Sequence, residues 1–300
     1  SAPDVRVQTW LFEVLHFLRV AEVFGDHSLV EITRTEAART RAPRPRLAIR
    51  NLVPAPHLQP RWQAAHSATL FSATLSPMDH TIHLLGLPAD VARLDVPSPF
   101  DPAQLQVRIT PHISTRYQDR ADSLDAVVAV MAAQFHAMPG NYLAFFSSFD
   151  YLQQVLARFA AVHPDIAAWS QSRGMAELDR SAFVARFTEH SQGIGFAVLG
   201  GAFGEGIDLP GQRLIGAFIA TLGLPQVNPL NEQLRARLQL QHGRGYDHAY
   251  LFPGLQKVVQ AAGRVIRGPD DRGVVVLMDD RFGRPEVRGL LPRWWRIQAG

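Results

Sequence analysis

The sequence predicts an α/β protein whose parallel β-sheet is covered by helices on both faces. Short, continuous apolar segments recur along the chain, and segments with apolar residues at helical spacing alternate with them. Continuous apolar strands are typical of parallel sheets, because both faces of such a sheet are buried. Several of these segments end in small or acidic residues, and in open α/β sheets ligands bind beyond the carboxyl ends of the strands.

The composition fits a globular protein of one large or two ordinary domains. The chain has 300 residues, of which 47% are hydrophobic and 19% are charged. It shows no apolar run of membrane-spanning length and no signal pattern, so we expect a cytoplasmic protein without a membrane partner. Because the chain has no cysteine, disulfides, Cys-based zinc sites and iron–sulfur ligation within it are excluded, and we predict no metal site.

The positive charge is carried almost entirely by arginine. Of the 30 basic residues only Lys257 is a lysine, and guanidinium groups suit phosphate, so a polyanionic partner is permitted. Arg39–Arg50 together with Arg34 places six arginines in 17 residues against one glutamate. This segment is either a solvated loop or a strip that faces phosphates.

The N-terminal part divides from the rest near a proline-rich stretch. Apolar residues at helical spacing predict an amphipathic or buried helix over Trp10–Phe24. Ala68–Leu75 is a short apolar run that ends in small hydroxyl residues. Leu94–Pro102 is the best candidate boundary. We therefore expect an N-terminal helical and extended segment over residues 1–95 and a second domain over residues 96–300.

The second domain is expected to alternate strands and helices. We predict strands over residues 141–149, 193–201, 214–223 and 273–281, and helices over residues 127–138, 150–163 and 253–267. Asp150 is a plausible N-cap of the middle helix. The residues expected at the carboxyl ends of the strands are Ser147, Ser148, Gly200, Gly201, Asp279 and Asp280.

Two further segments carry candidate chemistry. Leu199–Gly211 leaves a strand with five glycines around Glu205 and Asp208, which indicates either a tight connection with solvated acids or a backbone that approaches a ligand. Val258–Gly268 places Arg264 and Arg267 three residues apart behind Gln260 and Gly263. These arginines either bind an anion or form ion pairs with Asp279 or Asp280.

Four of these segments occur in an order that resembles a known family. FSATLSP, LAFFSSF, GAFGEGIDLPG and QAAGRVIR resemble motifs III, IV, V and VI of superfamily 2 helicases. Together with TRYQDR, LGLPQVNP, DRG and DDRF they are similar to the C-terminal motor portion of the XPD/DinG family of ATP-dependent DNA helicases. The resemblance covers nearly the whole chain and implies a RecA-like domain.

The resemblance also implies roles for the residues around the nucleotide. ATP binds between two RecA-like domains, and Arg264 and Arg267 are expected to touch its terminal phosphates while Gln260 positions the nucleotide or the attacking water. The other residues expected at this cofactor site are Gly204, Glu205, Gly206, Asp208 and Gly263.

A second group of residues is expected to contact DNA. Ser72 and Thr74 lie in the segment that relays between ATP and DNA in the family, and Ser147 and Ser148 are expected to donate to phosphate oxygens. Tyr117 and Arg120 are further candidates. The remaining aromatic candidates, Trp294 and Trp295, either stack on bases or pack the C-terminal segment.

The chain departs from a complete motor. No GxxxxGK[ST] loop and no DEAD- or DEAH-type run occur, and an ATPase of this class needs both. We therefore expect the N-terminal motor domain of the same protein to bind most of the ATP and Mg²⁺ and to carry the family's 4Fe-4S cluster. Residues 1–95 are either a remnant of that first domain or part of the second.

The expected function is that of a helicase part which is inactive alone. The resemblance implies 5′→3′ movement on single-stranded DNA or a forked duplex, in DNA repair, in a bacterial cytosol near the nucleoid. The alternative is a non-catalytic nucleic-acid-binding or scaffold module on the same fold. An intact motif VI argues against that alternative, because a scaffold does not need one.

Overall fold

The computed structural model describes residues 4–34, 45–204 and 206–299. It separates into two compact units, of which unit 1 comprises Ser1–Arg93 with Val227–Tyr246 and unit 2 comprises Leu94–Gln226 with Asp247–Gly300. The division after Arg93 falls beside the proline-rich stretch. The segment Val227–Tyr246, far along the chain, groups with the N-terminal residues, which no pattern in the sequence indicated. Among the described residues, no helix is long and apolar enough to cross a membrane.

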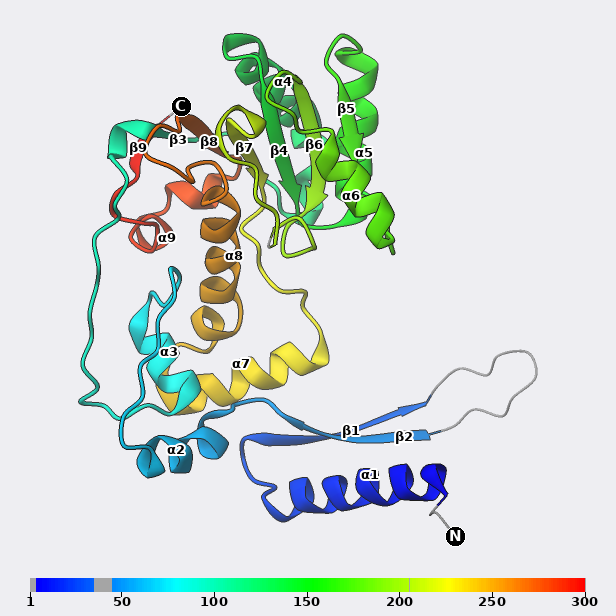
Figure 1. Ribbon diagram of the computed structural model, residues 1–300, viewed down its shortest axis with the longest axis vertical. Coiled ribbons are helices and arrows are strands. Elements are labelled where there is room, and N and C mark those ends of the chain that lie inside the picture. The colour runs from blue at the N-terminus through cyan, green and yellow to red at the C-terminus, as the bar shows by residue number, and fades with distance from the viewer. Residues whose placement is uncertain (1–3, 35–44, 205, 300) are drawn as a thin grey trace. The chain divides into compact units, whose positions relative to one another are not determined.

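Unit 2 contains a seven-stranded parallel sheet (Figure 1). Its strand order is β5-β6-β4-β7-β8-β3-β9. The strands are β3 (Leu105–Ile109), β4 (Asn141–Phe146), β5 (Ala168–Ser170), β6 (Gly193–Val198), β7 (Gly216–Ala220), β8 (Gly273–Leu277) and β9 (Arg296–Ala299). The helices of more than five residues are α4 (Arg120–Ala137), α5 (Phe149–Val162), α6 (Glu177–Ala185) and α8 (Phe252–Ala262). The shorter helical segments are Pro102–Gln104, Tyr117–Asp119, Gly211–Arg213, Asp247–Leu251, Asp280–Gly283 and α9 (Pro285–Arg288).

Helices cover both faces of this sheet, as predicted. Along β4, Leu143 and Phe145 face the cluster that includes α6 and α8, whereas Tyr142 and Phe146 face the cluster that includes α4 and α5. Because alternate side chains of a strand point to opposite faces, a fully apolar strand such as β4 can bury both sets. The prediction of a RecA-like α/β sheet with helices on both faces is confirmed.

Unit 1 is smaller and has an antiparallel pair of strands, β1 (Ser28–Arg34) and β2 (Pro45–Asn51), in a register that pairs Ser28 with Asn51. Its helices are α1 (Val5–Glu22), α2 (Ala55–Ala64), α3 (Met78–Leu85) and α7 (Pro229–His242). The predicted helix near the N-terminus is present, but none of its residues is buried. Residues 68–75 form no strand, and Phe71 is exposed. Of the arginine-rich strip, Arg39, Arg41 and Arg44 lie outside the described residues, whereas Arg34 belongs to β1 and Arg46 and Arg50 belong to β2, so these three do not lie in a loop.

Two local predictions were wrong. Ser148, and not Asp150, caps α5, because its side chain accepts a hydrogen bond from the backbone N–H of Tyr151. Helix α8 ends at Ala262, with Gly263 as its C-cap, so Arg264 and Arg267 follow the helix. The buried side chains of Val265 and Ile266 explain why the apolar pattern continues beyond the helix.

Candidate nucleotide and nucleic-acid site

The carboxyl ends of the central strands place polar and glycine residues at one edge of the sheet. Because β4, β6 and β8 belong to one parallel sheet, the residues that follow them emerge on the same side. These are Ser147 and Ser148 after β4, Gly200 and Gly201 after β6, and Asp279 and Asp280 after β8. The edge is the natural location for a ligand in this fold.

The loop that follows β6, residues 199–211, is rich in glycine and approaches helix α8 closely; it is called the glycine-rich loop. Gly200 has a φ of 78°, and a Cβ placed there would lie 3.2 Å from Cδ of Lys257. Gly206 also has a positive φ, of 79°. Both conformations favour glycine. Glu205, between Gly204 and Gly206, lies outside the described residues.

Arg264 is tied to this loop through backbone carbonyls. Its Nη1 donates to the carbonyl oxygen of Ile207 at 2.8 Å, and its Nη2 and Nε donate to that of Gly204 at 3.3 and 3.4 Å. The guanidinium group is half-buried. Arg264 therefore holds the loop against the turn that follows α8.

Arg267 is oriented differently. Its Nε donates to Oδ1 of Asp208 at 3.0 Å, and both side chains are substantially exposed, at 43% and 67%. Its two terminal nitrogens have no hydrogen-bond partner among the residues that the structure describes. An exposed ion pair of this kind contributes about 0–1 kcal/mol to stability, so its effect is mainly to orient the guanidinium group.

Gln260 and Gly263 complete this side of the site. The half-buried amide of Gln260 forms no hydrogen bond within the described ranges. Gly263 ends α8, and its N–H donates to the carbonyl oxygens of Val259 and Ala261. Gln260 thus lies in the last turn of α8, and Arg264 and Arg267 lie in the turn that follows it, where both contact the glycine-rich loop.

The two acids after β8 have other partners. Arg116 donates to both carboxylate oxygens of Asp280, at 2.8 and 2.9 Å. Asp279 is buried and accepts hydrogen bonds from Thr115 and Arg281. Burial by itself raises the pKa of Asp279, but the hydrogen bonds and charge of Arg281, aided by Thr115, lower it on balance. The alternative in which Arg264 or Arg267 pairs with these acids is not what the structure shows.

This network of hydrogen bonds and ion pairs was not predicted from the sequence. TRYQDR and DDRF contributed only to the resemblance, yet their side chains join residues 164 apart in the chain. The available signal was the concentration of arginine and aspartate in both segments. The pairing could not be assigned before the topology placed β3 beside β8.

The candidate DNA-binding residues fall into two groups. Arg120 donates to Oγ of Ser147 at 2.7 Å, and Tyr117 lies beside Arg120, so three of them meet in unit 2. Ser148 also lies there, as the cap of α5. Ser72 and Thr74 belong to unit 1, where their hydroxyl oxygens are 3.3 Å apart.

Both C-terminal tryptophans pack. Trp295 is buried in the core, and Trp294 packs against the same cluster, with its ring 6.2 Å from that of Phe100. Packing of the C-terminal segment is therefore the alternative that the structure supports.

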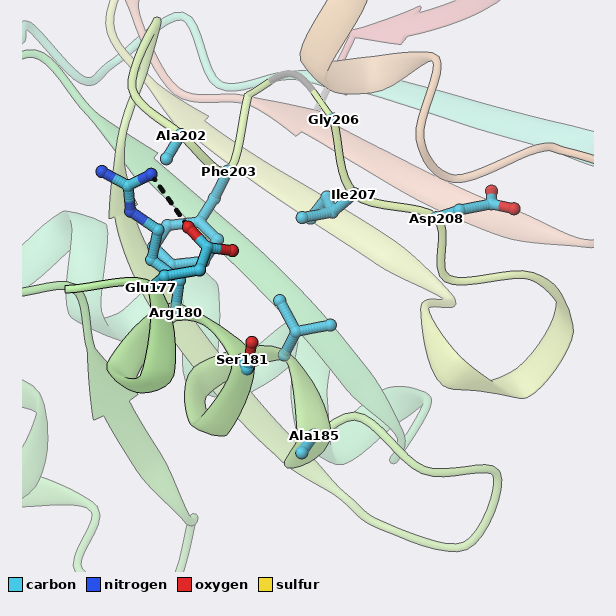
Figure 2. A pocket seen from close by; sticks show the side chains of 10 residues that line it. Glu177, Arg180, Ser181, Ala185, Ala202, Phe203, Gly206, Ile207 and Asp208 are labelled. Atoms are coloured by element: carbon cyan, nitrogen blue, oxygen red, sulfur yellow. Dashed lines mark hydrogen bonds and ion pairs between the residues drawn. The ribbon is translucent and has the colours of Figure 1, made fainter. Parts of the chain in front are cut away.

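An open pocket of about 540 Å³ lies between α6 and the glycine-rich loop (Figure 2). Phe203, Ile207 and Val184 supply apolar surface, and Glu177 with Arg180 forms a 3.4 Å ion pair at its rim. Asp208 also lines it, with a carboxylate directed away from that ion pair in Figure 2. The same aspartate orients Arg267. The pocket therefore adjoins the turn after α8 that carries Arg264 and Arg267, which is called the arginine turn. In the described part of the chain no group of three His, Cys, Asp or Glu residues could hold a metal ion.

Comparison with known proteins agrees with this arrangement. A sequence model of the helicase C-terminal domain matches residues 131–298. The chain belongs to the helicase C-terminal domain family. This confirms the resemblance to a C-terminal portion of an XPD-family superfamily 2 helicase, since curated relatives of that kind match as well.

Two such relatives are helicase subunits XPD of the general transcription and DNA repair factor IIH. The one from Dictyostelium discoideum is 26% identical over 79% of this chain and 33% of its own length. The XPD/RAD3 subunit from Saccharomyces cerevisiae is 25% identical over 97% of this chain and 39% of its own. The chain thus spans little more than a third of these relatives.

Solved structures support the fold of this family member. Those named XPD_Helicase and XPD_APO give TM-scores of 0.66 and 0.69, each at 19% identity. They cover 85% and 96% of this chain, and 46% and 57% of their own. At this level of identity the similarity shows the fold alone.

Proposed function

We propose that the chain is the C-terminal part of an ATP-dependent DNA helicase, in which it completes an ATP site shared with a first motor domain. The observation that carries this proposal is the arginine turn after α8. Arg267 is oriented by Asp208 and keeps its two terminal nitrogens without a partner in the described residues, while Arg264, in the same turn, donates to the glycine-rich loop. Such an arrangement suits an incoming anion.

The residues present fit part of a nucleoside triphosphate site. The guanidinium group of Arg267 suits a terminal phosphate, and the Gln260 amide, which has no hydrogen-bond partner among the described residues, can position a water or a phosphate oxygen. The phosphate-cradling loop and the Mg²⁺ ligands of an ATPase are absent from the sequence, so they belong to the first motor domain. When bound, ATP supplies the phosphoryl group whose transfer to water drives movement.

The two arginines have different tasks in this proposal. Arg267 directs positive charge at the phosphates and stabilises negative charge that develops during transfer. Arg264 is a positioning residue, because all three of its nitrogens donate to carbonyls of the glycine-rich loop. The loop therefore moves with the arginine turn, which couples nucleotide binding to the edge where Ser147 and Ser148 lie. DNA is bound at that edge through its backbone, and movement is 5′→3′.

The first test is DNA-stimulated ATP hydrolysis by a polypeptide that carries both motor domains. Arg267→Ala is expected to lower turnover by about 10³–10⁵-fold, the range that arginine fingers supply, with single-stranded DNA binding retained. Arg267→Lys is expected to restore little turnover. A lysine ammonium group is a single point charge and cannot bond Asp208 with one nitrogen while it directs two others at the phosphates. Arg264→Ala is expected to lower turnover and also to increase hydrogen exchange in residues 204–207.

The matched control is Arg272→Ala. This exposed arginine follows the same turn, and among the described residues it donates to no groups but the carbonyls of Pro269 and Asp271, so turnover should not change. The 300-residue chain alone should hydrolyse no ATP. Full turnover in both Arg264→Ala and Arg267→Ala would contradict the proposal and favour the non-catalytic module.

A further inference from the structure

Tyr117 is an exposed aromatic side chain on a firmly anchored segment. It is 88% exposed and begins the short helical turn Tyr117–Asp119. The residues before Tyr117 are held by the two acids that follow β8. Thr115 is hydrogen-bonded to the buried Asp279, and Arg116 donates to the carboxylate of Asp280. Ser114 adds a 2.6 Å hydrogen bond to Asp119. An exposed ring on such a support loses little conformational entropy when a ligand stacks on it.

Arg120 supports the ring of Tyr117 from the protein side. Its guanidinium carbon lies 5.5 Å from the centre of the Tyr117 ring and 4.8 Å from that of the buried Tyr151 ring. The guanidinium group thus contacts both rings, and cation–π contacts of this kind favour a fixed ring position. Hydrogen bonds from Nη2 to Ser147 and from Nε to the carbonyl oxygen of Thr115 hold Arg120 itself.

The charge of Arg120 has no carboxylate partner in the described part of the chain. Its Nη1 also makes no hydrogen bond there. Burial lowers the pKa of Arg120, and the positive charge of Arg281 lowers it further, although two tyrosines act in the opposite direction. A half-buried cation in this state is stabilised by an anion that approaches from solvent.

An exposed ring next to an unpaired cation matches the two parts of one nucleotide unit. We propose that Tyr117 is a base-stacking position for single-stranded DNA, with Arg120 attracting the adjoining phosphate. This inference rests on the proposed function and assigns a base contact to an edge where the serines contact only the backbone. Stacking on an aromatic ring does not depend on base identity, so the position serves movement along any sequence.

The test measures binding of fluorescein-labelled single-stranded oligothymidylate to the 300-residue chain at low salt. Tyr117→Ala is expected to weaken binding about 5- to 100-fold, the effect of losing one stacked base. Tyr117→Phe and Tyr117→Trp should bind like the wild type, because they keep an aromatic face. Tyr246→Ala, which removes another exposed tyrosine, is the matched control and should have no effect.

A second oligomer separates stacking from other causes. The same strand without bases has the phosphates alone, and Tyr117→Ala should bind it as tightly as the wild type does. A loss for both oligomers, or for neither, would overturn the base-stacking assignment while leaving the proposed function standing. If the wild-type chain bound neither oligomer up to millimolar concentration, both the inference and DNA binding by this part of the protein would be contradicted.

Discussion

At the scale of single residues, Asp279 is the most constrained polar side chain of the site. It is fully buried, and it joins Thr115 before α4 to Arg281 after β8. Removing one partner of a buried pair leaves the other charge without compensation, which costs far more than losing an exposed pair. Asp279 is therefore the buried one of the carboxylates that hold the segment around Tyr117.

We expect Asp279→Ala to lower the free energy of unfolding of unit 2 by about 3–5 kcal/mol, because Arg281 is left half-enclosed and unpaired. Urea unfolding followed by tryptophan fluorescence measures this change. Asp125→Ala, which breaks the exposed ion pair with Arg158, is the control and should cost less than about 1 kcal/mol. Equal costs for the two variants would contradict the role given to Asp279.

At the scale of elements, helix α8 is positioned by backbone contact with the end of β7. A Cβ added to Gly254 would lie 2.7 Å from the carbonyl oxygen of Leu222, and one added to Gly223 would lie 2.5 Å from that of Gly254. Two glycines thus allow the first turn of α8 to touch the chain beyond β7. This contact sets where the arginine turn lies at the other end of the helix.

We predict that Gly254→Ala lowers the free energy of unfolding by about 1–3 kcal/mol, because the added methyl group displaces backbone. The shift of α8 should also reduce DNA-stimulated ATP hydrolysis in the two-domain polypeptide. Gly283→Ala is the control, since in the described part of the chain no atom beyond its immediate chain neighbours and its own helical turn lies within 4 Å of a Cβ at that position. Thermal unfolding and turnover of both variants check the prediction, and a Gly254→Ala protein as stable as Gly283→Ala would refute it.

At the scale of the whole molecule, the two units differ in their titrating groups. His27, His80 and His242, whose pKa values are lowered, all lie in unit 1. Burial lowers the pKa of His80 to about 4, aided by the charge of His83. Two imidazoles, His83 of α3 and His242 of α7, stack with centres 4.0 Å apart. In unit 2 the fully buried carboxyl of Asp279 has a lowered pKa instead.

These shifts predict that unit 1 loses stability first as the pH falls. A histidine with a lowered folded pKa destabilises the fold as pH drops from 6.5 towards about 4, with a slope of at most about 1.4 kcal/mol per pH unit for each such group. The pKa of Asp279 is lower in the folded protein than its ordinary value of 3.8. Its contribution to stability is therefore fully present at every pH well above 3.8. Hydrogen exchange at pH 7 and pH 5, corrected for intrinsic rates, should show loss of protection in unit 1 alone. His80→Gln should reduce that loss, and equal losses in both units would rule out this account.

The order of segments along the chain was enough to predict the fold class, the strand ends and the family. Apolar strands that alternate with helices predicted the parallel sheet, because only a strand buried on both faces reads as continuously apolar. The same pattern placed Ser147, Gly200 and Asp279 at strand ends, where the structure has them. The motifs from FSATLSP to QAAGRVIR predicted the family. The roles of the site residues, and a domain boundary near residue 95, stay predictions.

Tertiary structure alone decided the partners of the charged side chains. The sequence could not show that Asp208 orients Arg267, or that Arg116 and Arg281 form ion pairs with the two acids after β8. The contacts of Arg267 and Arg116 join distant segments, whose alignment depends on the strand order. The sequence also misplaced the cap of α5 and the end of α8, since local hydrogen bonds and packing of Val265 and Ile266 outweigh helical periodicity there. Periodicity reports which faces are buried, whereas hydrogen-bond partners are fixed only when the folded chain brings donors and acceptors together.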